Sequence, residues 1–177
     1  IGYQNRPLLF DLNIKLPELL YERVIEVSER LNAKGEIIKE LNEEEVRNSL
    51  IEAKSDGINS VAIAFMHSYI NPSHENIIEK IAKEENFNQI SVSHKVSPLI
   101  KLVGRGDTTV VDAYLSPILR RYVNQVSEEL QDNKSTKLMF MQSNGGLTDA
   151  NLFQGKDALL SGPAGGVVSM TQTGKQA

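Results

Sequence analysis

The stretch KLMFMQSNGGLTDANLFQGKDALLSGPAGGVVS, residues 137–169, is the part of the sequence that points most directly to a fold. It opens with the apolar run Leu138–Met141, which is short enough for one buried strand and ends in Ser143–Gly146. A second apolar pair, Leu159–Leu160, leads into Ser161–Gly166. Two apolar segments that each end in a glycine-bearing loop are typical of connections in an α/β domain.

The second glycine-bearing segment is expected to form a tight turn that leads into a helix beginning near Gly165. Pro163 has no N–H and suits a turn in which none is needed. Glycines permit positive φ and leave room for a ligand beside the backbone. Free N–H groups in such loops, or at a helix N-terminus, bind phosphate or carboxylate. Each segment therefore has two interpretations, an anion-binding site or a tight connection.

Upstream residues alternate between helical and strand patterns. Asn42 and Glu45 have the spacing of a capping box for a helix that stops at Gly57. The run Val61–Met66 is apolar on both faces, as in a central parallel strand. Ser73 is expected to cap a second helix, and a short strand follows at 90–93. This alternation predicts an α/β fold with a mostly parallel sheet.

Three further elements are expected around these. Strands at 23–30 and 36–39, joined by a turn at 32–35, predict an N-terminal β-hairpin. Residues 94–106 are predicted to be a loop. An apolar stripe at helical spacing predicts a helix over about 108–131, bent at Pro117.

Composition limits the class of protein. The chain has 177 residues, a net charge of -4 with acids and bases interspersed, and no cysteine. We therefore expect no nucleic-acid partner, disulfide or thiolate metal site. No apolar run approaches the roughly 20 residues of a membrane span, so we expect a cytoplasmic protein without a membrane partner. The chain begins with Ile1 and ends within no evident element, which suggests a piece of a longer protein.

Several polar residues are candidates for a site, each with a plainer alternative. The histidines His67, His74 and His94 show no i, i+4 pair, so no metal site is expected, although His67 lies at the end of a predicted buried strand, where clefts open. Arg105 between two glycines is suited to bind an anion or to be an ordinary exposed arginine. Asp107 and Asp112 lie about one helical turn apart, a spacing explained by capping and a solvated face as well as by catalysis.

Seven motifs in order resemble the hydantoinase A / oxoprolinase family, which includes ATP-dependent N-methylhydantoinase, 5-oxoprolinase and acetone carboxylase subunits. The motifs are Arg6–Leu12, Tyr21–Val24, His67–Glu75, Ser93–Pro98, Thr108–Leu115, Met141–Gly146 and Ser161–Gly166. Together they extend over essentially the whole chain. Lys95, Leu99 and the segment Gly104–Asp107 depart from the residues expected in many relatives.

The resemblance implies an actin-like ATPase fold, of the ribonuclease H-like kind, and an internal fragment of it. Residues 1–134 would be the later part of the N-terminal domain, and residues 135–177 the start of the hydantoinase A domain. The two Asp-x-Gly-Gly-Thr phosphate loops of the family are not in this sequence.

The implied activity of the parent protein is ATP-dependent opening of a cyclic amide such as a hydantoin or 5-oxoproline. ATP and Mg²⁺ would act in the parent, with no tight binding expected to the fragment alone, and a second subunit of the hydantoinase B type is a possible partner. The alternative is a non-catalytic structural or docking lobe of an acetone-carboxylase-like assembly. No catalytic residue is predicted. The residues expected to line the nucleotide cleft are Ser143, Asn144, Gly145, Gly146, Ser161, Gly162, Gly165 and Gly166.

Overall fold

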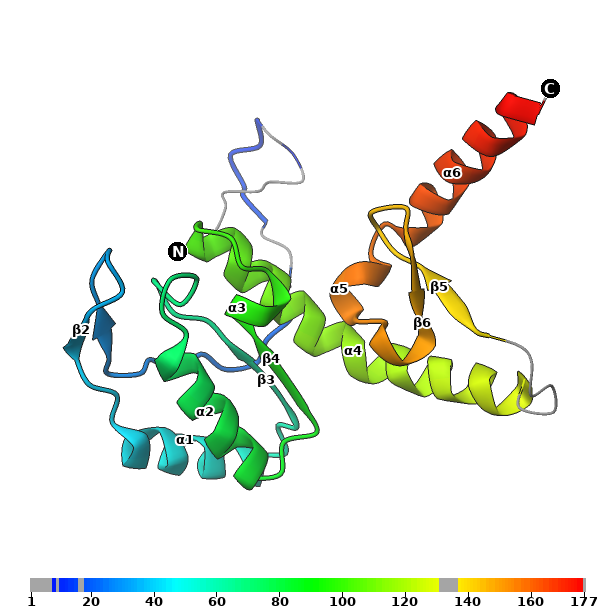
Figure 1. Ribbon diagram of the computed structural model, residues 1–177. Coiled ribbons are helices and arrows are strands. Elements are labelled where there is room, and N and C mark those ends of the chain that lie inside the picture. Colours follow the sequence, from blue (N-terminus) through cyan, green and yellow to red (C-terminus); the bar gives the residue numbers. More distant parts are fainter. Residues whose placement is uncertain (1–7, 9, 16–17, 131–136, 177) are drawn as a thin grey trace. The chain divides into compact units, whose positions relative to one another are not determined.

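A computed structural model describes residues 8, 10–15, 18–130 and 137–176 of the chain (Figure 1). The chain divides into two compact units, residues 1–110 and 111–177. This division by contacts does not test the domain boundary predicted at 134/135, which stays a prediction.

The first unit is built on a parallel pair of strands. β3 (Ser60–Ile63) and β4 (Gln89–Val92) pair in register from Ser60 with Gln89 to Ile63 with Val92. The crossover between them contains α2 (Ser73–Glu84), and α1 (Glu43–Ser55) precedes β3 and lies beside α2 (Figure 1). The predicted strand over 61–66 is wrong beyond Ile63, because the chain turns there toward α2. These elements share one core of buried apolar side chains: Val46, Leu50, Ala53, Ile63, Ile78, Ile81, Ala82, Phe87 and Val92.

The helix starts follow local chemistry. Asn42 caps α1 as predicted, since its side chain accepts the N–H of Glu45 at 3.2 Å. Ser73 does not cap α2. Pro72 holds that position, Ser73 is the first helical residue, and Asn71 Oδ1 accepts its N–H at 3.1 Å.

A short antiparallel pair precedes α1. β1 (Arg30–Leu31) pairs with β2 (Ile37–Lys39), and Gly35 in the connecting turn has φ +82°. The strand predicted over 23–30 is wrong for residues 23–29, which are irregular and mostly exposed. Alternation of apolar and polar residues forms a strand only where a partner strand accepts its backbone hydrogen bonds, and among the described residues only Arg30 and Leu31 of this segment have one.

The loop predicted at 94–106 is largely helical. α3 (Ser93–Val96) follows β4 directly, and α4 (Leu102–Leu130) begins six residues before the predicted start. Pro117 lies inside α4, as predicted. A proline removes one helical hydrogen bond, and packing along the rest of the helix keeps both sides helical.

The second unit holds an antiparallel hairpin and short helices. β5 (Met139–Met141) lies in the apolar run predicted to be a strand, but it is exposed or partly buried and not fully buried. It pairs with β6 (Leu147–Asp149), a strand that the sequence did not predict. A short 3₁₀ helix η1 (Ala150–Leu152), α5 (Gly155–Ala158) and α6 (Ser161–Gln176) follow. The tight turn predicted at 161–166 is wrong, because α6 already begins at Ser161. Pro163 is the third residue of α6, within the first turn, where helical N–H groups have no intrahelical partner and proline is tolerated.

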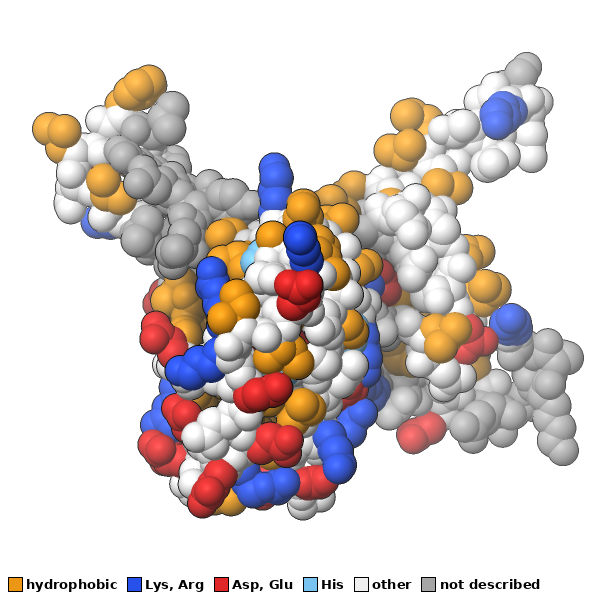
Figure 2. Space-filling model, turned by 60° about the vertical axis from the view of Figure 1, so that its left-hand side comes forward, with side chains coloured by type: hydrophobic (Ala, Val, Ile, Leu, Met, Phe, Trp, Pro, Cys, Tyr) orange, Lys and Arg blue, Asp and Glu red, His pale blue; other side chains and the backbone are white. Residues whose placement is uncertain are grey.

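The described residues thus form an α/β fold with three two-stranded sheets, of which only β3–β4 is parallel. The mostly parallel sheet predicted from the sequence is therefore not seen in this part of the chain. Acidic and basic side chains are interspersed on the face in Figure 2. Within the described ranges, no helix is both long and apolar enough to cross a membrane.

Candidate functional site

The predicted glycine segment Ser143–Gly146 is the turn between β5 and β6. Gly145 adopts φ +82°, a conformation that favours glycine, and its N–H donates to the Gln142 carbonyl at 3.0 Å. The N–H of Gly146 donates to Asn144 Oδ1 at 2.8 Å. Asn144 and Gly146 are exposed at the tip.

The fold brings this turn against the second glycine segment. The Ser143 N–H and hydroxyl both donate to the Asp157 carbonyl, at 2.7 and 2.6 Å, and Ser143 Oγ accepts the N–H of Leu160 at 3.0 Å. A Cβ built on Gly145 would lie 3.3 Å from Val168 of α6, and one on Gly165 would lie 3.7 Å from Met141. The two segments predicted to line one cleft are therefore neighbours.

The two segments differ in what they offer a ligand. The N–H groups of Ser143, Gly145 and Gly146 are all engaged within the chain, and the Ser161 hydroxyl donates to the Ala158 carbonyl at 2.9 Å. Gly162 and Gly166 of α6 are exposed, and a Cβ on either would meet nothing within 4 Å. Open approach is thus available along the N-terminal half of α6, and in its first turn, which includes Gly162, the helix dipole favours an anion.

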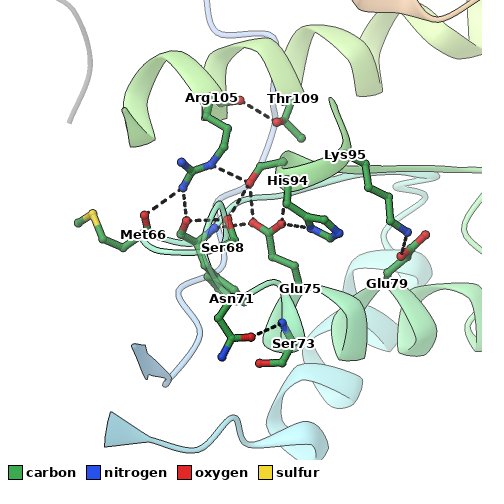
Figure 3. A network of polar contacts seen from close by, with 12 residues as sticks. Met66, Ser68, Asn71, Ser73, Glu75, Glu79, His94, Lys95, Arg105 and Thr109 are labelled. Atoms are coloured by element: carbon green, nitrogen blue, oxygen red, sulfur yellow. Dashed lines mark hydrogen bonds and ion pairs between the residues drawn. The ribbon is translucent and has the colours of Figure 1, made fainter. Parts of the chain in front are cut away.

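A second polar cluster lies in the first unit, at the carboxyl ends of β3 and β4 (Figure 3). Glu75 on α2 is fully buried, with 0% of its surface exposed. One carboxylate oxygen accepts the N–H of Phe65 at 2.9 Å and the hydroxyl of Ser93 at 2.6 Å. The other faces His94, whose N–H lies at 3.1 Å and whose Nδ1 lies at 2.6 Å. Glu75 thereby joins the segments that follow both strands.

Arg105 completes this cluster from α4. It is fully buried, and its Nε donates to Ser93 Oγ at 2.9 Å. Its other nitrogens donate to backbone carbonyl groups after β3 and after α3: those of Phe65, Met66, Leu99 and Ile100. Burial lowers the pKa of the Arg105 guanidinium, while the charge of Glu75 opposes this shift. Both alternatives drawn from the sequence for Arg105, an anion site and an exposed arginine, are wrong. The side chain is buried, and its hydrogen bonds join the segment after β3 to the segment after α3.

The other two histidines, His67 and His74, lie in the same sequence motif as Glu75 but do not contact its carboxylate in any hydrogen bond described above. His74 is buried, and its Nδ1 lies 2.7 Å from Glu29 Oε2, just before β1. His67 Nδ1 is buried without a hydrogen-bond partner among the described residues. No group of three or more His, Cys, Asp or Glu side chains in the described part of the chain could hold a metal ion.

Sequence reasoning missed the Glu75 cluster. Glu75 is the third residue of α2, where an acid usually serves the helix's own cap, so nothing in its spacing showed that it joins two strand ends. Arg105 stood out in the sequence only through its flanking glycines, and these do not account for its burial, since a Cβ on Gly106 would meet nothing within 4 Å.

Comparison with known proteins gives matches over most of the chain. A family model described as "Hydantoinase/oxoprolinase N-terminal region" matches residues 1–86, and one described as "Hydantoinase/oxoprolinase" matches residues 105–177. A Saccharomyces cerevisiae protein named 5-oxoprolinase is 40% identical over 200 aligned residues, which cover 98% of this chain and 16% of that protein. The chain therefore spans about a sixth of the length of this curated relative.

Two solved structures share the fold. The ATP-dependent caprolactamase from Pseudomonas jessenii superposes with a TM-score of 0.71 at 29% identity, covering 78% of this chain and 20% of that one. A nucleotide-free acetone carboxylase has a TM-score of 0.75 at 23% identity, covering 84% and 22%. At that identity the second likeness shows the fold alone.

Proposed function

Because the chain belongs to the hydantoinase/oxoprolinase family, we propose that the protein containing it is an ATP-dependent hydrolase that opens a cyclic amide. The observation that carries this proposal is the 40% identity to a protein named 5-oxoprolinase over 98% of the chain. A hydantoin or 5-oxoproline is the substrate that best fits the family. When bound, ATP would activate the amide by phosphorylating its oxygen.

The nucleotide would lie against α6 and the β5–β6 turn. Gly162 and Gly166 leave the backbone of α6 open to ribose or phosphate, and the N-terminal end of this 16-residue helix favours an anion. Ser161 and Gly165 belong to the same turns of α6. The neighbouring turn, Ser143–Gly146, would add contact area and the exposed Asn144 side chain, since its backbone donors are already engaged.

The other parts of the proposal concern the whole protein. Mg²⁺ would accompany ATP, held by groups that we do not assign to this chain. A second subunit of the hydantoinase B type and a cytoplasmic location fit the family. A non-catalytic lobe of a carboxylase-like assembly is the competing function, and it predicts no ring opening.

Two matched variants of the whole protein test the nucleotide site. Gly166→Leu places bulk over the open backbone, whereas Gly174→Leu makes the same change on the same helix eight residues away, also in open space. Leucine is a better helix former than glycine, so neither variant should lose stability.

We expect Gly166→Leu to weaken ATP binding at least about tenfold, or about 1.4 kcal/mol, while Gly174→Leu binds as wild type. Titration calorimetry and melting temperature on the same samples separate the two effects. Unchanged ATP affinity in Gly166→Leu would remove this surface from the nucleotide site.

A further inference from the structure

We propose that His94 is a proton-accepting catalytic residue of this protein, held in the required tautomer by the buried Glu75. This inference rests on the proposed hydrolase function. It assigns a residue to a catalytic task for which the two glycine segments provide no side chain. That task is to take a proton from the water that attacks the amide carbonyl carbon.

The geometry around Glu75 fixes which His94 nitrogen carries hydrogen. The Glu75 carboxylate accepts from the Phe65 N–H, the Ser93 hydroxyl and the His94 N–H. A carboxylate surrounded by donors acts only as an acceptor, so the 2.6 Å contact to His94 Nδ1 requires hydrogen on Nδ1. In the neutral ring, Nε2 then carries the lone pair.

His94 Nε2 is the nitrogen left for chemistry. No described residue forms a hydrogen bond with it, and the side chain keeps 14% of its surface exposed while Glu75 has none. The ring lies just beyond the carboxyl end of β4, at the edge of a parallel pair where α/β folds bind ligands. A carboxylate, an imidazole and an open nitrogen at such an edge form a base with a fixed orientation.

The surrounding charges support the step. Arg105 on α4 reaches Glu75 through Ser93, which keeps the carboxylate aligned behind the ring (Figure 3). Lys95, the next residue of α3, donates to Glu79 of α2 and so points its charge at α2. As the water oxygen bonds to the carbon of the O-phosphorylated amide, the C=N π electron pair moves to the ring nitrogen and one water proton moves to Nε2. The C–N bond then breaks as the carbonyl re-forms, the nitrogen leaves as an amine that takes the proton back, and a second water splits the resulting acyl phosphate into carboxylate and phosphate. The imidazolium that forms lies against Glu75.

A purely structural role for His94 makes a different prediction. In that case the Nδ1 hydrogen bond would only anchor α3 to α2, and Nε2 would be dispensable. His94→Asn separates the two roles, because its amide N–H can replace Nδ1–H toward Glu75 while nothing replaces Nε2. Lys95→Gln, on the same short helix, controls for local disturbance of α3.

Kinetics of the whole protein with ATP and a cyclic amide give the first test. We expect His94→Asn to lose about 10²- to 10⁴-fold in kcat with wild-type melting temperature and ATP affinity, and Lys95→Gln to keep its activity. Added imidazole should restore part of the rate.

Chemical modification provides a readout independent of turnover. Diethyl pyrocarbonate should modify His94 of the native protein rapidly and leave the buried His74 unmodified, as read by peptide mass spectrometry. An active wild type with an equally active His94→Asn variant, or an unreactive His94, would overturn the role of His94 alone. A wild type that opens no cyclic amide would overturn the proposed function and this role with it.

Discussion

At the scale of single residues, Gly155 lies so close to the backbone of α4 that a side chain would not fit. A Cβ there would lie 2.8 Å from the backbone nitrogen of Ser116 and 3.0 Å from the Asp112 carbonyl oxygen. The close approach lets the Gly155 N–H donate to Ser116 Oγ at 3.0 Å, and the neighbouring Lys156 N–H donate to Asp112 Oδ1 at 3.1 Å. Asp112 and Ser116 of α4 thus hold the start of α5. The solvated face expected for Asp112 is wrong, because its side chain is buried, and Asp107 lies inside α4 and not at the start of the helix, where it was expected to cap.

We predict that Gly155→Ala lowers the free energy of unfolding by about 1–3 kcal/mol, because the added methyl group must push backbone away from backbone. Gly106→Ala is the matched control: it lies in α4 with nothing within 4 Å of its Cβ, so it should be neutral or slightly stabilising. Urea unfolding of both variants measures the difference. Equal stability of the two variants would contradict the packing described for Gly155.

Replacing Arg105 tests whether the hydrogen bonds of its buried guanidinium stabilise the fold. Arg105→Lys keeps the charge but loses the planar fork that reaches Ser93 and several carbonyl groups at once. We expect a loss on the order of 3 kcal/mol in unfolding free energy, since buried acceptors lose their donors. Arg121→Lys, at an exposed position of α4, should change stability little. If Arg105→Lys lowers the melting temperature as little as Arg121→Lys does, the hydrogen bonds of Arg105 are not needed for stability.

At the scale of elements, α2 and α3 are linked by one acid between two lysines. Glu79 accepts from Lys83 at 2.8 Å within α2 and pairs with Lys95 of α3. Its partial burial acts to raise the pKa of the Glu79 carboxyl, but the two lysines outweigh burial and hold that pKa below its usual range.

The sign of the pH effect follows from this lowered pKa. The unfolded chain binds a proton at Glu79 near pH 4.3, roughly, while the folded chain still does not, so this contribution to stability is present above that pH and is lost as pH falls through the lower folded value. Glu79→Gln should flatten the acid limb of the stability–pH curve without affecting stability changes above about pH 6. An unchanged acid limb in the variant would show that the linkage lies elsewhere.

The elements also show where sequence patterns suffice. The Asn42 cap, the strand from Val61 to Ile63 and the helix through Pro117 were predictable, because each depends on residues adjacent in sequence. The burial expected on both faces of that strand is wrong, since only Ile63 is buried. The start of α6 was not, since Gly162 and Pro163 favour turns locally and are helical here at the N-terminal end, where both are tolerated. β6 was missed because Leu147–Asp149 is a strand only through its pairing with β5.

Of the two candidate sites, one was expected from the sequence and the other was not. That Ser143–Gly146 and Ser161–Gly166 line one cleft was expected from the family resemblance, and the hydrogen bond from the Leu160 N–H to Ser143 Oγ holds the β5–β6 turn beside the start of α6. The Glu75 cluster joins residues from Phe65 to Arg105, far apart in sequence. Such contacts arise from the crossover that brings the ends of β3 and β4 together, which local pattern does not encode.

At the scale of the whole molecule, the 177-residue chain covers 16% of the length of the Saccharomyces cerevisiae relative, and the activity proposed above is that of a protein containing this chain. We predict that the isolated chain neither hydrolyses ATP nor opens a ring, since the two Asp-x-Gly-Gly-Thr loops of the family are absent from its sequence. Phosphate release by highly purified chain is the measurement. Steady ATP hydrolysis that Gly166→Leu abolishes would contradict this.

The central claim, ATP-dependent opening of a cyclic amide, is tested most directly by product stoichiometry in the whole protein. Incubation with ATP, Mg²⁺ and 5-oxoproline or hydantoin, without bicarbonate, should yield ADP and ring-opened product together, and neither at an appreciable rate when the ATP or the cyclic amide is left out. Ring opening that proceeds without ATP, or the absence of ring opening with every cyclic amide tried, would contradict the account.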